Sequence, residues 1–225
     1  MLPLKDDIPS YSRPIVTYTI LGINIVVFLY ELMLGRNLHN FINRFGTVPY
    51  HIFHPTGASS YMTLFSSMFI HASFMHVFGN MLFLWIFADN VEDEIGHVKF
   101  IFFYLICGIA ATLLHSLTSS NSTIPMIGAS GAISGVLGAY VLLFPKAKIL
   151  ALIPFGFFLR LTYLPSLVFL GIWFLYQFLL GLSSIGAAGG GVAYFAHIGG
   201  FIAGLLLALP FKFKKRRGPY EYTIQ

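Results

Sequence analysis

Two side chains in this sequence have the chemistry for nucleophilic catalysis, Ser130 and His197. A serine hydroxyl attacks a carbonyl carbon well only when a base takes its proton. His197 is the only histidine of its apolar segment and is therefore the candidate base. Proton transfer requires an imidazole nitrogen about 2.6–3.2 Å from the hydroxyl oxygen. We predict that Ser130 is a nucleophile and His197 its general base, which requires their two segments to cross closely.

Such a reaction also needs hydrogen-bond donors for the negatively charged oxygen of a tetrahedral intermediate. His76 and Asn80 are four residues apart, so they would share one face of a helix. A ring N–H of His76 and the side-chain amide of Asn80 could form an oxyanion hole with the backbone N–H of Ser130, which would open a helix. Asn80 could instead only link helices through hydrogen bonds.

The acidic residues offer no third catalytic member. They lie near the two chain ends, at Glu31 and in the segment 89–94. We therefore predict a Ser–His dyad with no carboxylate against His197. The zinc-protease pattern His-Glu-x2-His is also missing, because His71 and His76 are five residues apart with no glutamate between them. We expect no metal and no cofactor.

The composition is that of a membrane protein. Of the 225 residues, 57% are hydrophobic and only 9% are charged, and the mean hydropathy is +0.80. A soluble domain carries about a quarter charged residues, so lipid must be the solvent for much of this chain. The net charge of +5 owes much to a basic cluster after the last apolar segment. That pattern indicates a cytoplasmic membrane flank rather than nucleic-acid binding.

Six apolar stretches could cross a bilayer, which takes roughly 20 helical residues. They are 15–33, 62–88, 99–117, 130–144, 165–180 and 192–211. We therefore predict an all-α, polytopic bundle of six transmembrane helices. Gly131 with Gly135, and Gly200 with Gly204, are small-xxx-small pairs that let two helix backbones approach closely in lipid.

Lysine and arginine predict the orientation. With both termini inside, only Arg36 and Arg44 of the basic residues fall outside, as the positive-inside rule favours. The expected organisation is a cytoplasmic segment 1–14, a six-helix domain 15–211 and a basic cytoplasmic tail 212–225.

The same topology leaves a long outer loop at about 35–61. It also brings the polar candidates to one depth, because the second, fourth and sixth stretches all enter from the outer face. Polar residues inside a span are functional candidates by default. We expect Trp85 and Trp173, in contrast, to contact lipid or the membrane interface.

Three motifs resemble the rhomboid family of intramembrane serine proteases. They are Gly128-Ala129-Ser130-Gly131, then His71-x4-His76-x3-Asn80, and Ala196-His197-x2-Gly200-x3-Gly204. Together they are specific in order and spacing, and the resemblance covers nearly the whole chain. It implies a bundle around a water-filled cavity open to the outside, and a transmembrane substrate cut near its outer end. The fifth helix or the loop before the sixth would gate entry.

The resemblance also implies roles for further residues. His71 and the motif glycines Gly128, Gly131, Gly200 and Gly204 would support the site. Some bacterial members place a tyrosine one turn after the nucleophile, against the histidine, where this sequence has Ser134. The chain looks like the minimal six-helix bacterial form, which implies a bacterial plasma (inner) membrane protein whose partners are transmembrane substrates and the lipid bilayer.

Two other functions compete with proteolysis. A transporter or channel would also use polar residues and glycine-rich helices, but it would need a charged relay in mid-membrane, which this sequence lacks. A catalytically inactive relative that only binds membrane proteins would have no need of both Ser130 and His197.

Overall fold

The computed structural model describes residues 1–156, 158–185 and 191–212. The helices are α1 (Ile15–Met33), α2 (Leu38–Phe45), α3 (Pro49–Phe53), α4 (Ser59–Ser66), α5 (Phe74–Ile95), α6 (His97–Thr118), α7 (Ser130–Leu143), α8 (Ser166–Ser183) and α9 (Tyr194–Lys212), with short 3-10 helices at Gly35–Asn37 and Ser67–Phe69. The strands are β1 (Leu2–Lys5), β2 (Lys148–Phe155) and β3 (Phe158–Pro165). The predicted tail, apart from Lys212, and residues 186–190 of the predicted gate lie outside the described residues.

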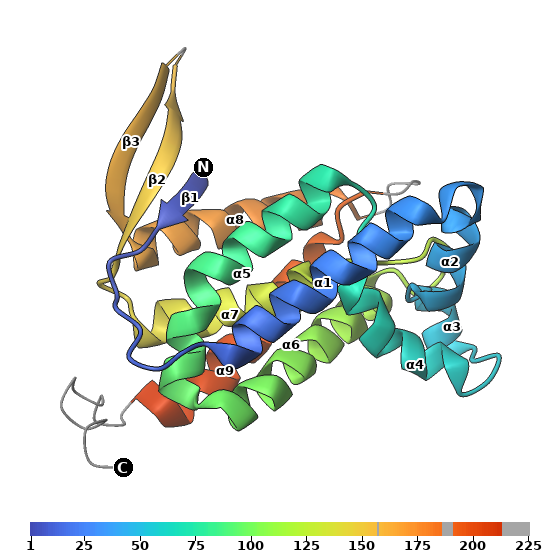
Figure 1. Cartoon of the computed structure of the whole chain (residues 1–225). Helices are drawn as coiled ribbons and strands as arrows, with labels where there is room; N and C mark the ends of the chain where they lie inside the picture. The colour runs from blue at the N-terminus through green and yellow to red at the C-terminus, as the bar shows by residue number, and fades with distance from the viewer. Residues whose placement is uncertain (157, 186–190, 213–225) are drawn as a thin grey trace.

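Five helices, α1, α5, α6, α8 and α9, are long and apolar enough to cross a membrane. Helix α7 has only 14 residues, about 21 Å of helix, and almost all of it is buried. It lies among the longer helices, where it contacts α5, α6, α8 and α9 (Figure 1). This arrangement confirms the predicted polytopic helical bundle, with its shortest member at the centre.

The second predicted stretch, 62–88, was wrong as a single helix. The chain leaves the helical conformation at Ile70, which is extended, and α5 begins only after Ser73. Ser73 caps α5, since its hydroxyl accepts a hydrogen bond from the backbone N–H of His76 at 3.2 Å. His71 therefore lies in the connection before α5 rather than within a helix. The predicted outer loop is largely helical, because a 3-10 helix, α2, α3 and the start of α4 lie within it.

A three-stranded antiparallel sheet, ordered β1-β2-β3, was not predicted. Strands β2 and β3 connect the end of α7 to the start of α8, and they form a hairpin that stands away from the helices (Figure 1). Gly156 makes the turn with a φ of 60°, which favours glycine. Strand β2 is apolar on both faces after Lys148, so it lacks the polar–apolar alternation by which a half-buried strand is found, and in β3 that alternation is confined to residues 159–163.

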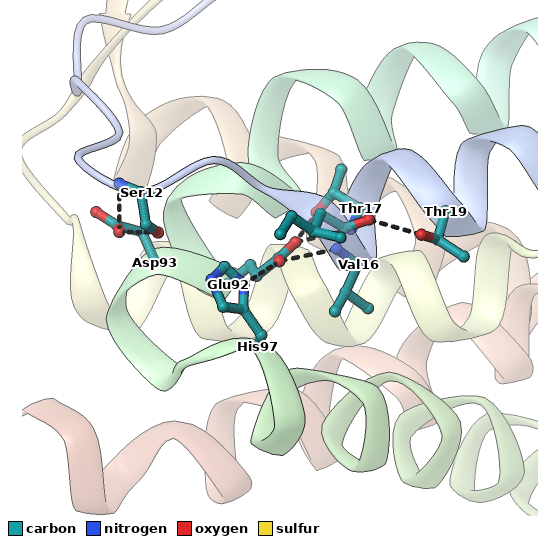
Figure 2. A network of polar contacts seen from close by, with 8 residues as sticks. Ser12, Val16, Thr17, Thr19, Glu92, Asp93 and His97 are labelled. Carbon is teal, nitrogen blue, oxygen red and sulfur yellow. Dashed lines mark hydrogen bonds and ion pairs between the residues drawn. The ribbon is translucent and has the colours of Figure 1, made fainter.

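Glu92, near the end of α5, fixes the start of α1 (Figure 2). Its buried carboxylate accepts hydrogen bonds from the backbone N–H groups of Val16 and Thr17 at 2.9 and 2.7 Å, and from the Thr17 hydroxyl. Nδ1 of His97 lies 2.5 Å from the same carboxylate. One acidic side chain thus satisfies the free donors of α1 and joins three helices at one end of the bundle.

Candidate active site

The closest helix pair, α7 and α9, brings the two reactive side chains together. A Cβ atom added to Gly200 would lie 1.9 Å from the backbone oxygen of Gly131, and one added to Gly204 would lie 1.9 Å from that of Gly135. The two backbones are therefore in direct contact, and any larger side chain would force them apart. His197, one turn before Gly200, lies beside the first residue of α7, Ser130.

The geometry between these two residues suits proton transfer. His197 Nε2 lies 2.8 Å from Ser130 Oγ, within the range for proton transfer. On the other side of the ring, Nδ1 lies 2.8 Å from Oε1 of Gln177. An amide oxygen only accepts hydrogen bonds, so Nδ1 carries the hydrogen and the Nε2 lone pair faces the serine hydroxyl.

Gln177 and Trp173, both on α8, were missed by the sequence reasoning. The signal for Gln177 was present, since it is a buried polar residue in an otherwise apolar span. Trp173 lies one turn before it, and its ring centroid is 6.0 Å from that of His197. The expectation that Trp173 contacts lipid or the membrane interface rather than the site was wrong, because it lines the site cavity. Trp85 is mostly exposed and stacks on Tyr18.

Two donor groups face the backbone just before Ser130. Gly128 has a φ of 117°, and a Cβ atom there would lie 2.6 Å from His76 Nε2 and 3.7 Å from Asn80 Nδ2. The backbone N–H of Ala72 donates a long hydrogen bond, 3.4 Å, to His76 Nδ1, which leaves the ring hydrogen on Nε2. Asn80 Nδ2 is buried and has no hydrogen-bond partner in the described part of the chain. Both nitrogens are thus available to an incoming oxygen.

His71 lies behind this pair rather than in the cavity. Its ring packs edge-on against that of His76, with 5.1 Å between the centroids. Its backbone N–H donates to the buried carboxylate of Glu31, 3.2 and 3.3 Å from the two oxygens. Glu31, another residue that the sequence reasoning left without a role, therefore holds the connection that carries His71. The Ser134 hydroxyl donates to the carbonyl of Ser130 at 2.6 Å, and within the described residues it makes no hydrogen bond to His197.

A cavity of about 790 Å³ unites the site. Its walls include Ser130, His197, Gln177, His76 and Asn80, together with apolar side chains of α5, α7 and α9. That volume falls within the usual range for a ligand site. Among the described residues, no group of three or more His, Cys, Asp or Glu side chains could hold a metal ion.

Known proteins resemble the chain over most of this architecture. Residues 58–212 match the family model described as "Rhomboid domain". The mitochondrial Rhomboid protein 1 of Saccharomyces cerevisiae is 31% identical over 196 residues, 84% of this chain and 51% of the relative. RHOMBOID-like protein 1 of Arabidopsis thaliana is 31% identical over 158 residues, 70% of this chain and 36% of the relative. A zebrafish (Danio rerio) relative, Presenilin-associated rhomboid-like protein A, mitochondrial, is 31% identical over 104 residues, 45% of this chain and 27% of the relative.

The chain spans about half the length of the yeast relative and less of the other two. Two of these relatives are named as mitochondrial, so the comparisons do not support the predicted bacterial type or a bacterial plasma membrane location. The apolar helices make the chain a multi-pass integral membrane protein. With the matched model covering most of those helices, the chain belongs to the rhomboid family.

Proposed function

We propose that this protein is an intramembrane serine endopeptidase that cleaves transmembrane segments of other membrane proteins. The observation that carries the proposal is the 2.8 Å contact between Ser130 Oγ and the unprotonated Nε2 of His197. A serine and a histidine buried together in a lipid-embedded bundle have little structural value, since apolar residues would pack there at lower cost. Acyl transfer needs a serine hydroxyl paired with a base, beside hydrogen-bond donors such as those of His76 and Asn80.

In the proposed reaction, Ser130 Oγ attacks the carbonyl carbon of the scissile peptide while His197 Nε2 takes its proton. The resulting imidazolium keeps its Nδ1–H bonded to Gln177, so the ring does not turn away. His76 Nε2–H, Asn80 Nδ2–H and the Ser130 backbone N–H stabilise the tetrahedral oxyanion. His197 then protonates the leaving amine, and a water activated by the same nitrogen hydrolyses the acyl-enzyme.

The proposed topology follows from the helix order and the positive-inside rule. With both ends of the chain cytoplasmic, 1–14 and 212–225 are cytoplasmic segments, and 15–211 is the protease domain. The site then lies in the outer half of the bilayer, next to α2, whose His39, Ile42 and Asn43 line the cavity. Substrates would be cut near their outer ends. Since the curated relatives are longer, the activity proposed here is that of the part of the protein given by this sequence.

A fluorophosphonate probe tests the proposal in the intact protein in membranes. We expect covalent labelling that is lost in Ser130→Ala and strongly reduced in His197→Ala. Cleavage of a reporter transmembrane substrate should show the same dependence and should be insensitive to EDTA. A matched control is Ser183→Ala, an exposed serine at the far end of α8. Cleavage that persists in Ser130→Ala would falsify the proposal, and substrate binding without any cleavage would favour an inactive binding protein.

A further inference from the structure

The sheet has one apolar face that the helices do not cover. The register pairs Leu152 with Leu161 and Leu150 with Tyr163, so these four side chains share a face. Leu159 joins them toward the tip, opposite Pro154. We call Leu150, Leu152, Leu159, Leu161 and Tyr163 the hairpin face. Its β3 members Leu159, Leu161 and Tyr163 are 67%, 58% and 51% exposed.

The base of the other face of the hairpin is already occupied. Ile149 and Ala151, which alternate with the hairpin face, are fully buried and belong to the main apolar core. The hairpin is therefore fixed at its base against the bundle, and its two strands extend away from the helices (Figure 1). The hairpin face is the side opposite the buried Ile149 and Ala151. A contiguous exposed apolar surface of this kind marks an interaction site.

The position of the hairpin in the chain indicates whether hydrocarbon, headgroups or water lie next to it. It begins directly after α7 and ends directly before α8, on the side of the membrane where α1 begins. Helix α7 is enclosed by other helices, but most of α8 is exposed and apolar, so lipid surrounds α8 there. The hairpin cannot lie fully in the hydrocarbon, however, because β3 pairs on one edge only within the described chain. Unpaired backbone groups of an open sheet edge need water or polar headgroups.

Charge around the sheet favours one kind of lipid. Lys5, Lys146, Lys148 and Arg160 are all exposed, and none of them has a carboxylate partner in the described chain. Two carboxylates lie near them: the half-buried Asp6 accepts a hydrogen bond from the Tyr140 hydroxyl, and the exposed Asp7 accepts one from the backbone N–H of Lys148 at 2.7 Å. The four basic side chains outnumber these two acidic ones. Basic residues beside an apolar surface attract anionic headgroups.

We propose that the hairpin lies at the boundary between headgroups and acyl chains, with the hairpin face in the acyl region and the basic side chains on anionic phospholipid. The occupant of this face is thus the bilayer itself, on the side where α1 begins. This inference does not depend on the proposed protease activity.

Site-directed spin labelling of the full chain in lipid nanodiscs tests it. Leu161→Cys places a label on the hairpin face, and Arg160→Cys, the matched control, places one on the opposite face one residue away. The native Cys107 is buried, so the parent protein should take up no label. We expect the label at 161 to be accessible to dissolved oxygen and protected from a water-soluble nickel chelate. The label at 160 should show the reverse.

A change of lipid composition tests whether the basic side chains bind anionic phospholipid. Phosphatidylglycerol added to phosphatidylcholine nanodiscs should increase the depth reported by the label at 161. Lys5→Gln with Lys148→Gln should remove that increase. A label at 161 that the nickel chelate reaches as easily as the label at 160 would overturn the proposal. So would dipolar coupling between labels at 161, which would place a second copy of the chain on the hairpin face. An unchanged depth in phosphatidylglycerol would overturn the assignment to anionic lipid.

Discussion

At the scale of single residues, Gln177 orients the imidazole of His197 where no Asp or Glu in the described part of the chain is placed to do so. His197 has no carboxylate to hold it, and its partners among the described residues are Ser130 and Gln177. An amide oxygen can fix the tautomer and the ring plane as a carboxylate does, but it adds no negative charge to a site surrounded by lipid. A neutral orienting group avoids the desolvation that a buried carboxylate would suffer. Gln177 is thus a positioning residue in the proposed mechanism.

Replacement of Gln177 should show whether it acts by orienting the His197 ring or only by filling space in the bundle. In Gln177→Met the volume is kept but the acceptor is lost, and a lost hydrogen bond of about 1–3 kcal/mol corresponds to about a ten- to hundredfold lower kcat with little change in KM. In Gln177→Glu a carboxylate would favour the protonated imidazole, so the acidic limb of the pH–rate profile should move to higher pH. A purely structural role would leave that limb in place. Phe178→Leu, the exposed neighbour on α8, is the control.

Gly128 combines a backbone conformation that favours glycine with close contact to His76, a proposed oxyanion donor. Gly128→Ala would strain a φ of 117° and place a methyl group 2.6 Å from His76 Nε2. Displacing one oxyanion donor costs about 10²–10³ in kcat, and we expect a loss of that order in cleavage of the reporter substrate. Gly22→Ala on α1, where an added Cβ meets nothing within 4 Å, should keep full activity. Equal activity of the two variants would contradict the assignment of His76 as a donor.

At the scale of elements, the long apolar helices could be predicted because lipid requires them. Runs of apolar residues set the start of α1 and α7 to the residue. The break before α5 could not be found in the same way, because it depends on Ser73 as a cap within a hydrophobic run. The hairpin was missed for a related reason, since β2 is apolar on both faces and only residues 159–163 of β3 alternate between polar and apolar. The sequence shows Gln177 as a polar residue in an apolar span, but only the packing of α8 against α9 shows that its side chain contacts His197.

The α7–α9 crossing sets the distance between the proposed nucleophile and base. In Gly204→Val the added Cβ would lie 1.9 Å from the carbonyl oxygen of Gly135, so the helices must separate. Overpacking of this kind costs about 1–3 kcal/mol, and we expect a lower thermal unfolding temperature in micelles together with lost fluorophosphonate labelling. Gly171→Val on α8 meets no atom within 4 Å and serves as the control. Labelling at the parental level in Gly204→Val would show that close contact here is unnecessary.

At the scale of the whole molecule, the two ends of the bundle are built differently. The end where α1 begins is held to the N-terminal segment by hydrogen bonds. The Ser10 hydroxyl donates to Asp89 at 2.6 Å, and Ser12 donates to Asp93 (Figure 2). The other end holds the cavity, and inside it Asn80 Nδ2 has no hydrogen-bond partner among the described residues. A fixed end and an open end suit the proposed peptidase, which would admit a peptide from one side without losing its helix packing.

Asp6 ties the N-terminal segment to α7, and it makes this fixed end sensitive to pH. Burial raises the pKa of its carboxyl group from 3.8 to about 6, a hydrogen bond from the Tyr140 hydroxyl opposes the shift, and the charge of Asp89 adds to it. The folded protein therefore holds the Asp6 proton more tightly than the unfolded chain does. The stability from that proton is fully present below about pH 4 and is lost as the pH rises through about 6.

We expect Asp6→Asn, which keeps an acceptor for Tyr140 without the charge, to remove this pH dependence. Between about pH 4 and 6 the thermal unfolding temperature of the parent in micelles should fall relative to that of the variant. The difference should amount to about 1 kcal/mol once solvent screening at this half-buried site is allowed for. Parallel curves for the two proteins across that range would mean that the carboxyl group is already solvated in the folded state, and that the N-terminal segment is held by its other hydrogen bonds alone.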